Sequence, residues 1–276
     1  METPNTGSDL LIEPDALQTL LAERENLLLV DLSKPQVYEE SHIPGAVYMQ
    51  PTLLTRGEKP APGNMPSLAQ LSERLSDIGF SEEKLVVAYD DEGGGWAGRL
   101  IWTLDMIDHK HYLYLNGGIH TWVEAGLPIE TGSQPATASK YHATMAKHPP
   151  IMEKEDILSR LNQPGFTIWD ARSPQEFSGE KCLAQKGGHI PGAINFEWTE
   201  GMDKNRSLRI KELDELRNTL ESLGIRAEDE VVTHCQTHHR SGFTYLLGKV
   251  LGFANIKAYP GSWSEWGNDA NTPIET

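Results

Sequence analysis

The 276-residue chain carries the same ordered set of motifs twice. Each copy has an apolar run ending in Asp, at Asp31 and Asp170, followed by His-Ile-Pro-Gly-Ala at 42–46 and 189–193. Each copy continues with a β-branched apolar run, a Gly and Trp pair, and a final Pro-Ile-Glu. An internal repeat of this length predicts two copies of one folding unit, so we expect two similar domains.

The two copies differ in length at one place. Their Asp residues lie 139 positions apart, whereas the first residues of the His-Ile-Pro-Gly-Ala motifs lie 147 positions apart. The second copy therefore carries eight extra residues between Phe177 and Gly188, and these include Cys182. The insertion contains Lys and Gly, which favours an exposed loop with Cys182 as a bystander. The alternative is that Cys182 resolves a disulfide with Cys235.

Short apolar runs alternate with amphipathic segments of helical period in each copy. We expect strands at 27–32, 86–89, 113–115, 166–169, 231–234 and 256–259. We expect helices at 68–78, 98–107, 208–223 and 241–251. This alternation predicts an α/β protein in which each domain has a mostly parallel sheet flanked by helices on both faces. In such sheets, functional sites lie beyond the carboxyl ends of the strands.

A stretch rich in Ser, Thr, Ala and Pro separates the two copies and has no apolar periodicity. Such a composition is typical of a linker. We therefore expect a first domain at 9–130, a linker at 131–149 and a second domain at 150–276.

The composition excludes several classes of function. A formal net charge of −16 opposes binding to nucleic acid and to anionic membrane surfaces. No segment has the ~20 apolar residues of a membrane span, and Met1–Asp9 has neither the basic nor the apolar part of a secretory signal. Two cysteines without a Cys-x-x-Cys pair exclude a disulfide framework and a Cys-based metal site. We expect a cytoplasmic monomer without a cofactor.

The loop that follows the second predicted strand differs sharply between the copies. The first copy has Asp-Asp-Glu-Gly-Gly-Gly at 90–95, and the second has Cys-Gln-Thr-His-His-Arg at 235–240. Backbone N–H groups of a strand-to-helix loop and the start of the next helix favour an anion, and Arg240 adds a cation. We therefore predict that Cys235 is a nucleophile with a pKa below the free value of roughly 8.5. The alternative is a buried structural cysteine.

The other residues of this loop are predicted to line the substrate site: Gln236, Thr237, His238, His239 and Arg240. The two histidines are expected to supply positive potential and loop shape, and a metal pair is the weaker interpretation because no third ligand is near in sequence. Arg172 and Trp198 are predicted to border the same pocket. The first His of each His-Ile-Pro-Gly-Ala motif recurs in the copy without a nucleophile, which favours a structural role.

The duplicated Asp and His-Ile-Pro-Gly-Ala motifs, the Cys-loop-Arg segment and the Gly-Ser-Trp segment together resemble the tandem-domain rhodaneses, from about Leu10 to Glu275. The resemblance implies an inactive first domain and a catalytic second domain. It implies that thiosulfate gives its outer sulfur to Cys235 as a persulfide, which cyanide or a thiol acceptor then takes. The loop at 235–240 is similar to the Cys-Gln-Thr-His-His-Arg loop of a bacterial type of thiosulfate sulfurtransferase.

Three alternatives stay open at this point. The loop differs from the Cys-Arg-Lys-Gly-Val-Thr and Cys-Gly-Ser/Ala-Gly-Val-Thr loops of other tandem types, so 3-mercaptopyruvate is a second candidate donor. A phosphatase or arsenate reductase with a Cys-x5-Arg loop is a second enzyme class, disfavoured because Cys235 and Arg240 enclose four residues. A non-catalytic sulfur carrier is the third, and thioredoxin-like or sulfur-trafficking proteins are candidate acceptors.

Overall fold

The computed structural model describes residues 7–133 and 136–276. Most of Met1–Asp9, where the sequence predicts no secretory signal, and part of the predicted linker lie outside these ranges. Over the described residues, no helix combines the length and the apolar character needed to cross a membrane.

The helices and strands of the first copy are β1 (Leu11–Ile12), α1 (Pro14–Glu23), β2 (Leu27–Asp31), α2 (Pro35–Glu40), β3 (Val47–Tyr48), α3 (Leu68–Asp77), β4 (Leu85–Tyr89), α4 (Gly95–Met106), β5 (Tyr112–Leu115) and α5 (Gly118–Glu124). Those of the second are α6 (Lys154–Arg160), β6 (Phe166–Asp170), α7 (Pro174–Phe177), β7 (Ile194–Asn195), β8 (Met202–Asp203), β9 (Arg209–Ile210), α8 (Leu213–Leu223), β10 (Glu230–His234), α9 (Arg240–Val250), β11 (Ile256–Ala258) and α10 (Ser262–Trp266). Short 3-10 helices span Gly7–Leu10, Pro51–Leu54 and Trp198–Gly201.

Each copy builds one parallel sheet. The first sheet has the order β1-β5-β4-β2-β3 and the second has β11-β10-β6-β7, with parallel pairing throughout both. The central strands correspond, because β2 pairs with β4 as β6 pairs with β10. The α/β class with two tandem domains, predicted from the repeat, is confirmed.

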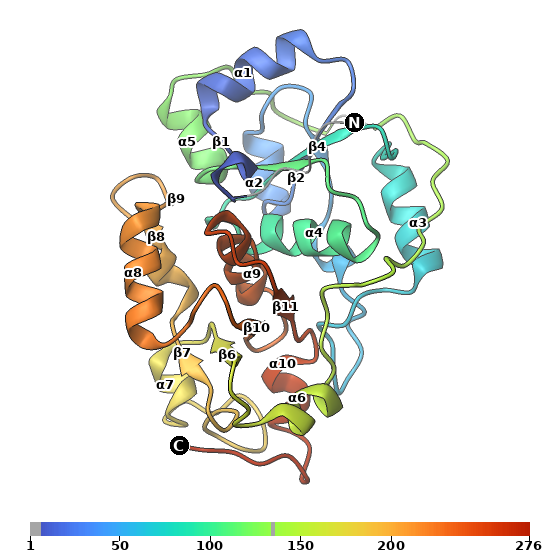
Figure 1. Cartoon of the computed structure of the whole chain (residues 1–276). Coiled ribbons are helices and arrows are strands. Elements are labelled where there is room, and N and C mark those ends of the chain that lie inside the picture. Colours follow the sequence, from blue (N-terminus) through green and yellow to red (C-terminus); the bar gives the residue numbers. More distant parts are fainter. Residues whose placement is uncertain (1–6, 134–135) are drawn as a thin grey trace.

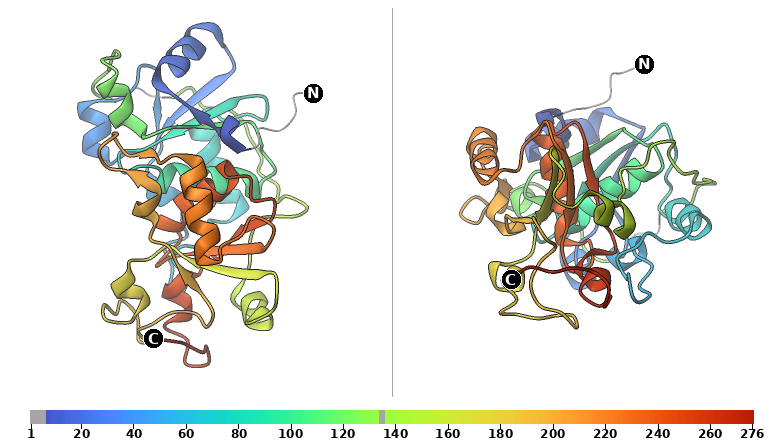
Figure 2. Two further views of the ribbon diagram at one scale, coloured as in Figure 1. Left: turned by 60° about the vertical axis from the view of Figure 1, so that its left-hand side comes forward. Right: turned by 60° about the horizontal axis from the view of Figure 1, so that its bottom comes forward.

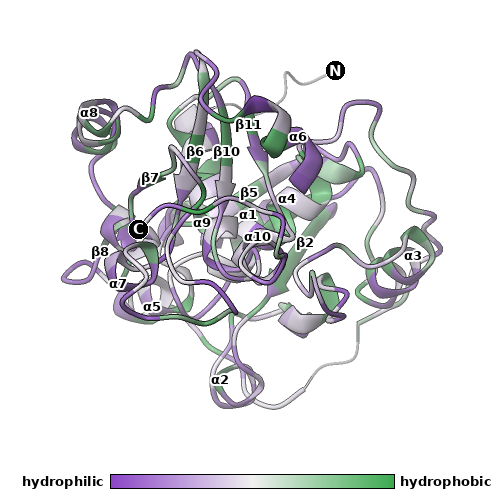
Figure 3. Ribbon diagram, turned by 90° about the horizontal axis from the view of Figure 1, so that it is seen from below, coloured by the Kyte–Doolittle hydropathy of each residue, from purple (hydrophilic) through white to green (hydrophobic). Residues whose placement is uncertain are grey.

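Successive residues of each central strand point to opposite faces of the sheet, as the pleat requires. Val30 and Ala88 face one core, while Leu29 and Val87 face a second core with residues of α1 and α5. In the second sheet, Val231 faces the first core and Val232 faces a third core with residues of α6 and α10. Strand β2 is accordingly coloured largely hydrophobic in Figure 3.

The two domains share one continuous core, which contains residues of α4 and α9. These helices lie side by side in the middle of the molecule, between the two sheets (Figure 1). Glycines permit the approach, because a Cβ atom on Gly98 would collide with the carbonyl oxygen of Gly242. The left view of Figure 2 shows the yellow-to-red half below the blue-to-green half, with the orange helix α8 at the front.

Several predicted boundaries differ by one to three residues, as in the helix expected at 98–107, which spans Gly95–Met106, and one differs by five. The helix expected at 208–223 begins at Leu213, because Arg209–Ile210 pairs with Met202–Asp203 as the antiparallel ribbon β8–β9. The strand β1 and the helix α1 were not predicted. The apolar residues of this segment complete the first sheet at its edge and cover one face of it.

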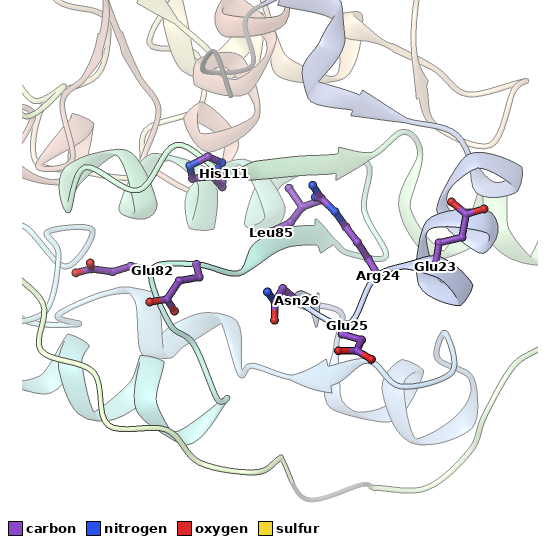
Figure 4. A pocket seen from close by; sticks show the side chains of 8 residues that line it. Glu23, Arg24, Glu25, Asn26, Glu82, Leu85 and His111 are labelled. Carbon is purple, nitrogen blue, oxygen red and sulfur yellow. The ribbon is translucent and has the colours of Figure 1, made fainter. Parts of the chain in front are cut away.

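The first domain has a pocket at the amino ends of its strands, whereas the predicted site lies at the carboxyl end of a strand in the second domain. The pocket is lined by Glu23, Arg24, Glu25, Asn26, Glu82, Glu83, Leu85 and His111, near the amino ends of β2 and β4 (Figure 4). Several glutamates and no thiol line it, so the chemistry predicted from the sequence belongs to the carboxyl ends of the strands instead.

Candidate active site

Cys235 lies directly after β10, at the carboxyl end of the second sheet, and is 1% exposed. Two hydrogen bonds tie the start of this loop to α10. The Trp263 N–H donates to the Cys235 carbonyl (2.9 Å), and the Ser264 N–H donates to the Gln236 carbonyl (2.9 Å). The loop then turns into α9 at Arg240. The thiol therefore sits at the amino end of a buried helix, as the sequence predicts.

Several donors converge on the sulfur. The Ser241 hydroxyl donates to Sγ (3.4 Å), and the backbone N–H groups of Thr237 and Ser241 also point to it. Burial alone would raise the pKa of Cys235, but the charge of Arg240 and these donors together hold it below its ordinary value. The direction agrees with the prediction from sequence.

The first domain contains the same anion nest, filled by its own side chain. Asp90 follows β4 as Cys235 follows β10, and it is fully buried. Its carboxylate accepts the backbone N–H groups of Glu92, Gly94, Trp96 and Ala97 at 2.8–3.1 Å. The fold thus places converging amides at this point of both domains, and in the first domain a carboxylate occupies them.

His238 acts through hydrogen bonds rather than through charge, which corrects the expectation of positive potential at this residue. It is fully buried, and burial together with Arg99 and His239 holds its pKa well below the ordinary value. Its Nδ1 lies 2.8 Å from the Ser241 Oγ. Because the single hydroxyl proton of Ser241 goes to Cys235 Sγ, Nδ1–H must donate to Oγ. A neutral relay therefore runs from His238 through Ser241 to the sulfur.

Arg240 does not present a free guanidinium. Its Nη1 and Nη2 donate to the two carboxylate oxygens of Glu176 at 2.6 and 2.9 Å. Burial would raise the pKa of Glu176, but the bonds to Arg240 and Ser173 lower it to about 2. Glu176 itself is fixed by a capping box with Ser173 at the start of α7.

Arg172 is held in a similar way. Its guanidinium donates to Asp170 (2.6 Å for Nη2) and to the Gly188 carbonyl (2.9 Å), and it stacks over Trp263. The residue is 1% exposed. Its contact with a substrate stays a prediction, and the structure gives it the role of fixing Asp170 beside His234.

His239 and Trp198 are partly exposed and their rings lie close together. The His239 ring stacks on Trp96 with centroids 4.4 Å apart, and Trp198 lies 5.7 Å away. Its Nε2 contacts the Glu92 carboxylate of the first domain. The acidic loop at 90–95 therefore touches the second domain as well as filling its own nest.

Gln236 and Thr237 are partly exposed and lie between two covering segments. The Gln236 amide donates to the Leu183 carbonyl (3.4 Å) in the insertion that holds Cys182. On the other side, a Cβ atom on Gly63 would collide with the Thr237 carbonyl. Cys182 is exposed and donates to the Ala184 carbonyl.

The histidines of the His-Ile-Pro-Gly-Ala motifs are structural, as predicted from their symmetry. His42 stacks on Tyr38, and His189 stacks on Phe177. Each also bridges to the final Glu of its own repeat, and this Glu accepts the N–H of the motif glycine.

Three residues of the site were missed from the sequence: Ser241, Glu176 and Arg99. The Ser-Pro-Gln-Glu segment at 173–176 has the spacing of a helix capping box, but nothing in it indicates that Glu176 also binds Arg240. Arg99 lies in the other domain. Within the described ranges, no group of three metal-ligating side chains is found at the histidines or elsewhere.

Comparison with known proteins identifies the fold. A family model described as "Rhodanese-like domain" matches residues 13–125 and 153–269. A protein named thiosulfate sulfurtransferase from Azotobacter vinelandii is 50% identical over 266 residues, covering 96% of this chain and 97% of the relative. One of the same name from Pseudomonas aeruginosa is 48% identical with the same coverage. The solved structure titled "Crystal structure of YnjE" superposes with a TM-score of 0.88 at 24% identity, covering 97% of this chain and 68% of that one. The chain belongs to the rhodanese-like family, with two tandem copies of its domain.

Proposed function

We propose that the protein is a thiosulfate sulfurtransferase that carries the transferred sulfur as a persulfide on Cys235. The observation that supports this most directly is the buried sulfur in a nest of N–H and O–H donors, with its pKa held below the ordinary value. The two relatives at 48% and 50% identity bear the same name over nearly the whole chain.

In the first step, the Cys235 thiolate attacks the outer sulfur of thiosulfate. A new S–S bond forms to Cys235, the S–S bond of thiosulfate breaks, and sulfite leaves with its electron pair. The product is a persulfide whose terminal sulfur carries the negative charge. Donors from Thr237 and Ser241 that stabilise the thiolate are placed to stabilise this anion as well.

In the second step, an acceptor such as cyanide attacks the terminal sulfur. The bond between this sulfur and Cys235 breaks, thiocyanate leaves, and the thiolate returns. Electrons balance within the two steps, so no external oxidant or reductant enters. The 1% exposure of Cys235 favours small acceptors or one extended thiol over a bulky group.

A phosphatase is a weaker interpretation of the same loop. Phosphatase chemistry needs an arginine fork that grips phosphate oxygens at two points. Here both terminal nitrogens of the Arg240 fork are bound to Glu176. The ion pair keeps the field of Arg240 near the sulfur but removes the fork from the substrate.

We further propose that residues 150–276 carry the nucleophile and that residues 9–130 are non-catalytic but cover the site, with 131–149 joining them. Gln236, Thr237, His239 and Trp198 are substrate-binding candidates, whereas His238 and Arg240 act on the sulfur itself. A cytoplasmic location, a monomeric state and a thioredoxin-like acceptor stay predictions, as does 3-mercaptopyruvate as an alternative donor.

The test is sulfur transfer from thiosulfate to cyanide by wild type, Cys235→Ala and Cys182→Ala. We expect Cys235→Ala to abolish thiocyanate formation and Cys182→Ala to keep it. Mass spectrometry after thiosulfate treatment should find one added sulfur atom on the Cys235 peptide. Full activity in Cys235→Ala would contradict the proposal, and faster turnover with 3-mercaptopyruvate would reassign the donor.

A further inference from the structure

Arg99 belongs to the first domain but reaches the catalytic loop of the second. It lies on α4 and is fully buried. Its Nη2 donates to the Leu54 carbonyl (2.7 Å), and its Nη1 donates to the His238 carbonyl (3.2 Å). The guanidinium also lies over the ring of Trp102, with 4.6 Å between its carbon and the ring centroid.

None of these partners carries a negative charge. In the part of the chain that the structure describes, the two terminal nitrogens of Arg99 bond to backbone carbonyls, its Nε has no hydrogen-bond partner, and no ion pair includes it. The other two arginines near the site differ, because Arg172 is paired with Asp170 and Arg240 with Glu176. An isolated buried cation is costly, so proteins pair such groups. The counter-charge of Arg99 must therefore come from a group that is not a carboxylate.

Cys235 is the group that meets this requirement. Burial lowers the pKa of Arg99 to about 9, and an anionic Cys235 opposes this shift. The charged and titratable groups around the sulfur lie on several neighbouring elements. They are Arg240 on α9, His238 and His239 in the loop, His234 on β10, Asp170 at the end of β6, and Glu176 on α7. The two carboxylates are bound to arginines and His238 is neutral. Arg240 also acts on the sulfur, but it shares its charge with Glu176, so Arg99 is the arginine of this set whose charge no carboxylate balances.

We propose that Arg99 is the counter-ion of the anionic sulfur at Cys235, in the thiolate and in the persulfide. It acts across the domain boundary through its charge and through the His238 carbonyl, so it is a positioning residue. This inference rests on the proposed role of Cys235. It gives the first domain a direct part in the chemistry, because Arg99 would no longer lie near the sulfur if the two domains were separated.

The experiment measures the alkylation of Cys235 by iodoacetamide as a function of pH in a Cys182→Ser background, because Cys182 is exposed and would react. Arg99→Gln keeps an N–H donor for the His238 carbonyl but removes the charge, whereas Arg99→Lys keeps both. An opposite charge nearby lowers a pKa by about 1–3 units. We expect Arg99→Gln to raise the midpoint by about one unit and Arg99→Lys to stay close to the wild type. At a pH below both alkylation midpoints, thiosulfate kcat/KM should fall about tenfold in Arg99→Gln, in step with the lost thiolate.

Lys249→Gln is the matched control. Lys249 is also a cation that joins the domains, but it is paired with Asp105 (2.6 Å). Its loss should lower the thermal midpoint without moving the alkylation midpoint. A purely structural role for Arg99 predicts the same pattern for Arg99→Gln.

A folded Arg99→Gln with an unshifted midpoint would overturn the inference. If Arg99→Gln does not fold, Cys235→Ser is added to remove the buried anion; recovery of the fold supports the pairing and continued unfolding contradicts it. Alkylation does not require sulfur transfer. If Arg99→Gln shifts the alkylation midpoint but Cys235 never forms a persulfide, the Arg99–thiolate pair stands and the proposed function alone is rejected.

Discussion

Glu176 and Arg240 form a two-point ion pair beside the sulfur of Cys235, with N–O distances of 2.6 and 2.9 Å. The glutamate is 3% exposed and is itself fixed by Ser173. The guanidinium of Arg240 is therefore fixed by two hydrogen bonds, and its charge near the sulfur is partly cancelled by Glu176.

Glu176→Gln is expected to lower the thiol pKa of Cys235, because Arg240 then acts on the sulfur without a compensating anion. The alkylation midpoint should move to lower pH. Loss of the partly buried pair should also reduce the free energy of unfolding by about 2 kcal/mol. The pKa of Glu176 is lowered to about 2, so this stability is present above the ordinary Glu pKa and lost as pH falls toward 2. An alkylation midpoint that rises would contradict this electrostatic account.

Ser241→Ala removes the hydroxyl that links His238 to the sulfur. The thiolate then loses one donor, and a hydrogen bond to a charged group contributes about 1.5–3 kcal/mol. We expect a higher alkylation midpoint and a thiosulfate kcat/KM lower by about tenfold or more. Ser264→Ala is the control, since its hydroxyl donates to the Pro60 carbonyl and not to the sulfur. Equal activity in the two variants would exclude the relay.

The sequence was sufficient to predict the two parallel sheets and the place of Cys235 at the carboxyl end of a central strand. The repeat aligned Asp90 with Cys235, and the structure places both directly after the corresponding central strand. Such residues are found by sequence because the ends of buried strands follow from local apolar runs. The helix expected at 208–223 was too long, since the pairing of β8 with β9 depends on contacts that no local pattern encodes.

The electrostatics of the site could not be predicted in the same way. Arg240 looked like a free cation, and its neutralisation by Glu176 depends on where α7 lies relative to α9. His238 looked like a source of positive charge, but burial keeps it neutral. Arg99 lies 136 positions before Cys235, and only the packing of α4 on α9 brings it to the loop. The pairing of Arg240, the neutral state of His238 and the position of Arg99 all depend on tertiary contacts rather than on residue type.

Asp90→Asn tests the nest of the first domain. Its carboxylate accepts four backbone N–H groups, whereas an amide has one acceptor oxygen and would turn an NH2 group toward donors. We expect a loss of about 2–3 kcal/mol in urea unfolding at pH 8, with an unchanged alkylation midpoint. Asp108→Asn is the exposed control, and an equal loss in both variants would show that the nest adds no stability.

Asp105 joins the domains at the far end of the α4–α9 contact. Its carboxylate accepts bonds from Lys249 and the Tyr245 hydroxyl of the second domain, both at 2.6 Å, and from Lys110 and the Tyr112 hydroxyl of the first, both at 2.8 Å. Asp105→Asn leaves Lys249 without its counter-ion at a buried boundary. We expect the free energy of unfolding to fall by about 3 kcal/mol at pH 7.

The pH dependence of this loss distinguishes charge from packing. Burial alone would raise the pKa of Asp105, but Lys249 and Lys110 hold it below the ordinary value. The stabilisation is therefore complete above the unfolded pKa of about 3.9 and is lost as pH falls through the lower folded pKa. The difference between wild type and Asp105→Asn in urea unfolding should be constant from pH 6 to 8 and shrink below about pH 4. Tyr245→Phe removes one donor but keeps the charge, so its smaller loss should not follow this curve. A difference for Asp105→Asn that persists unchanged in acid would assign the effect to packing.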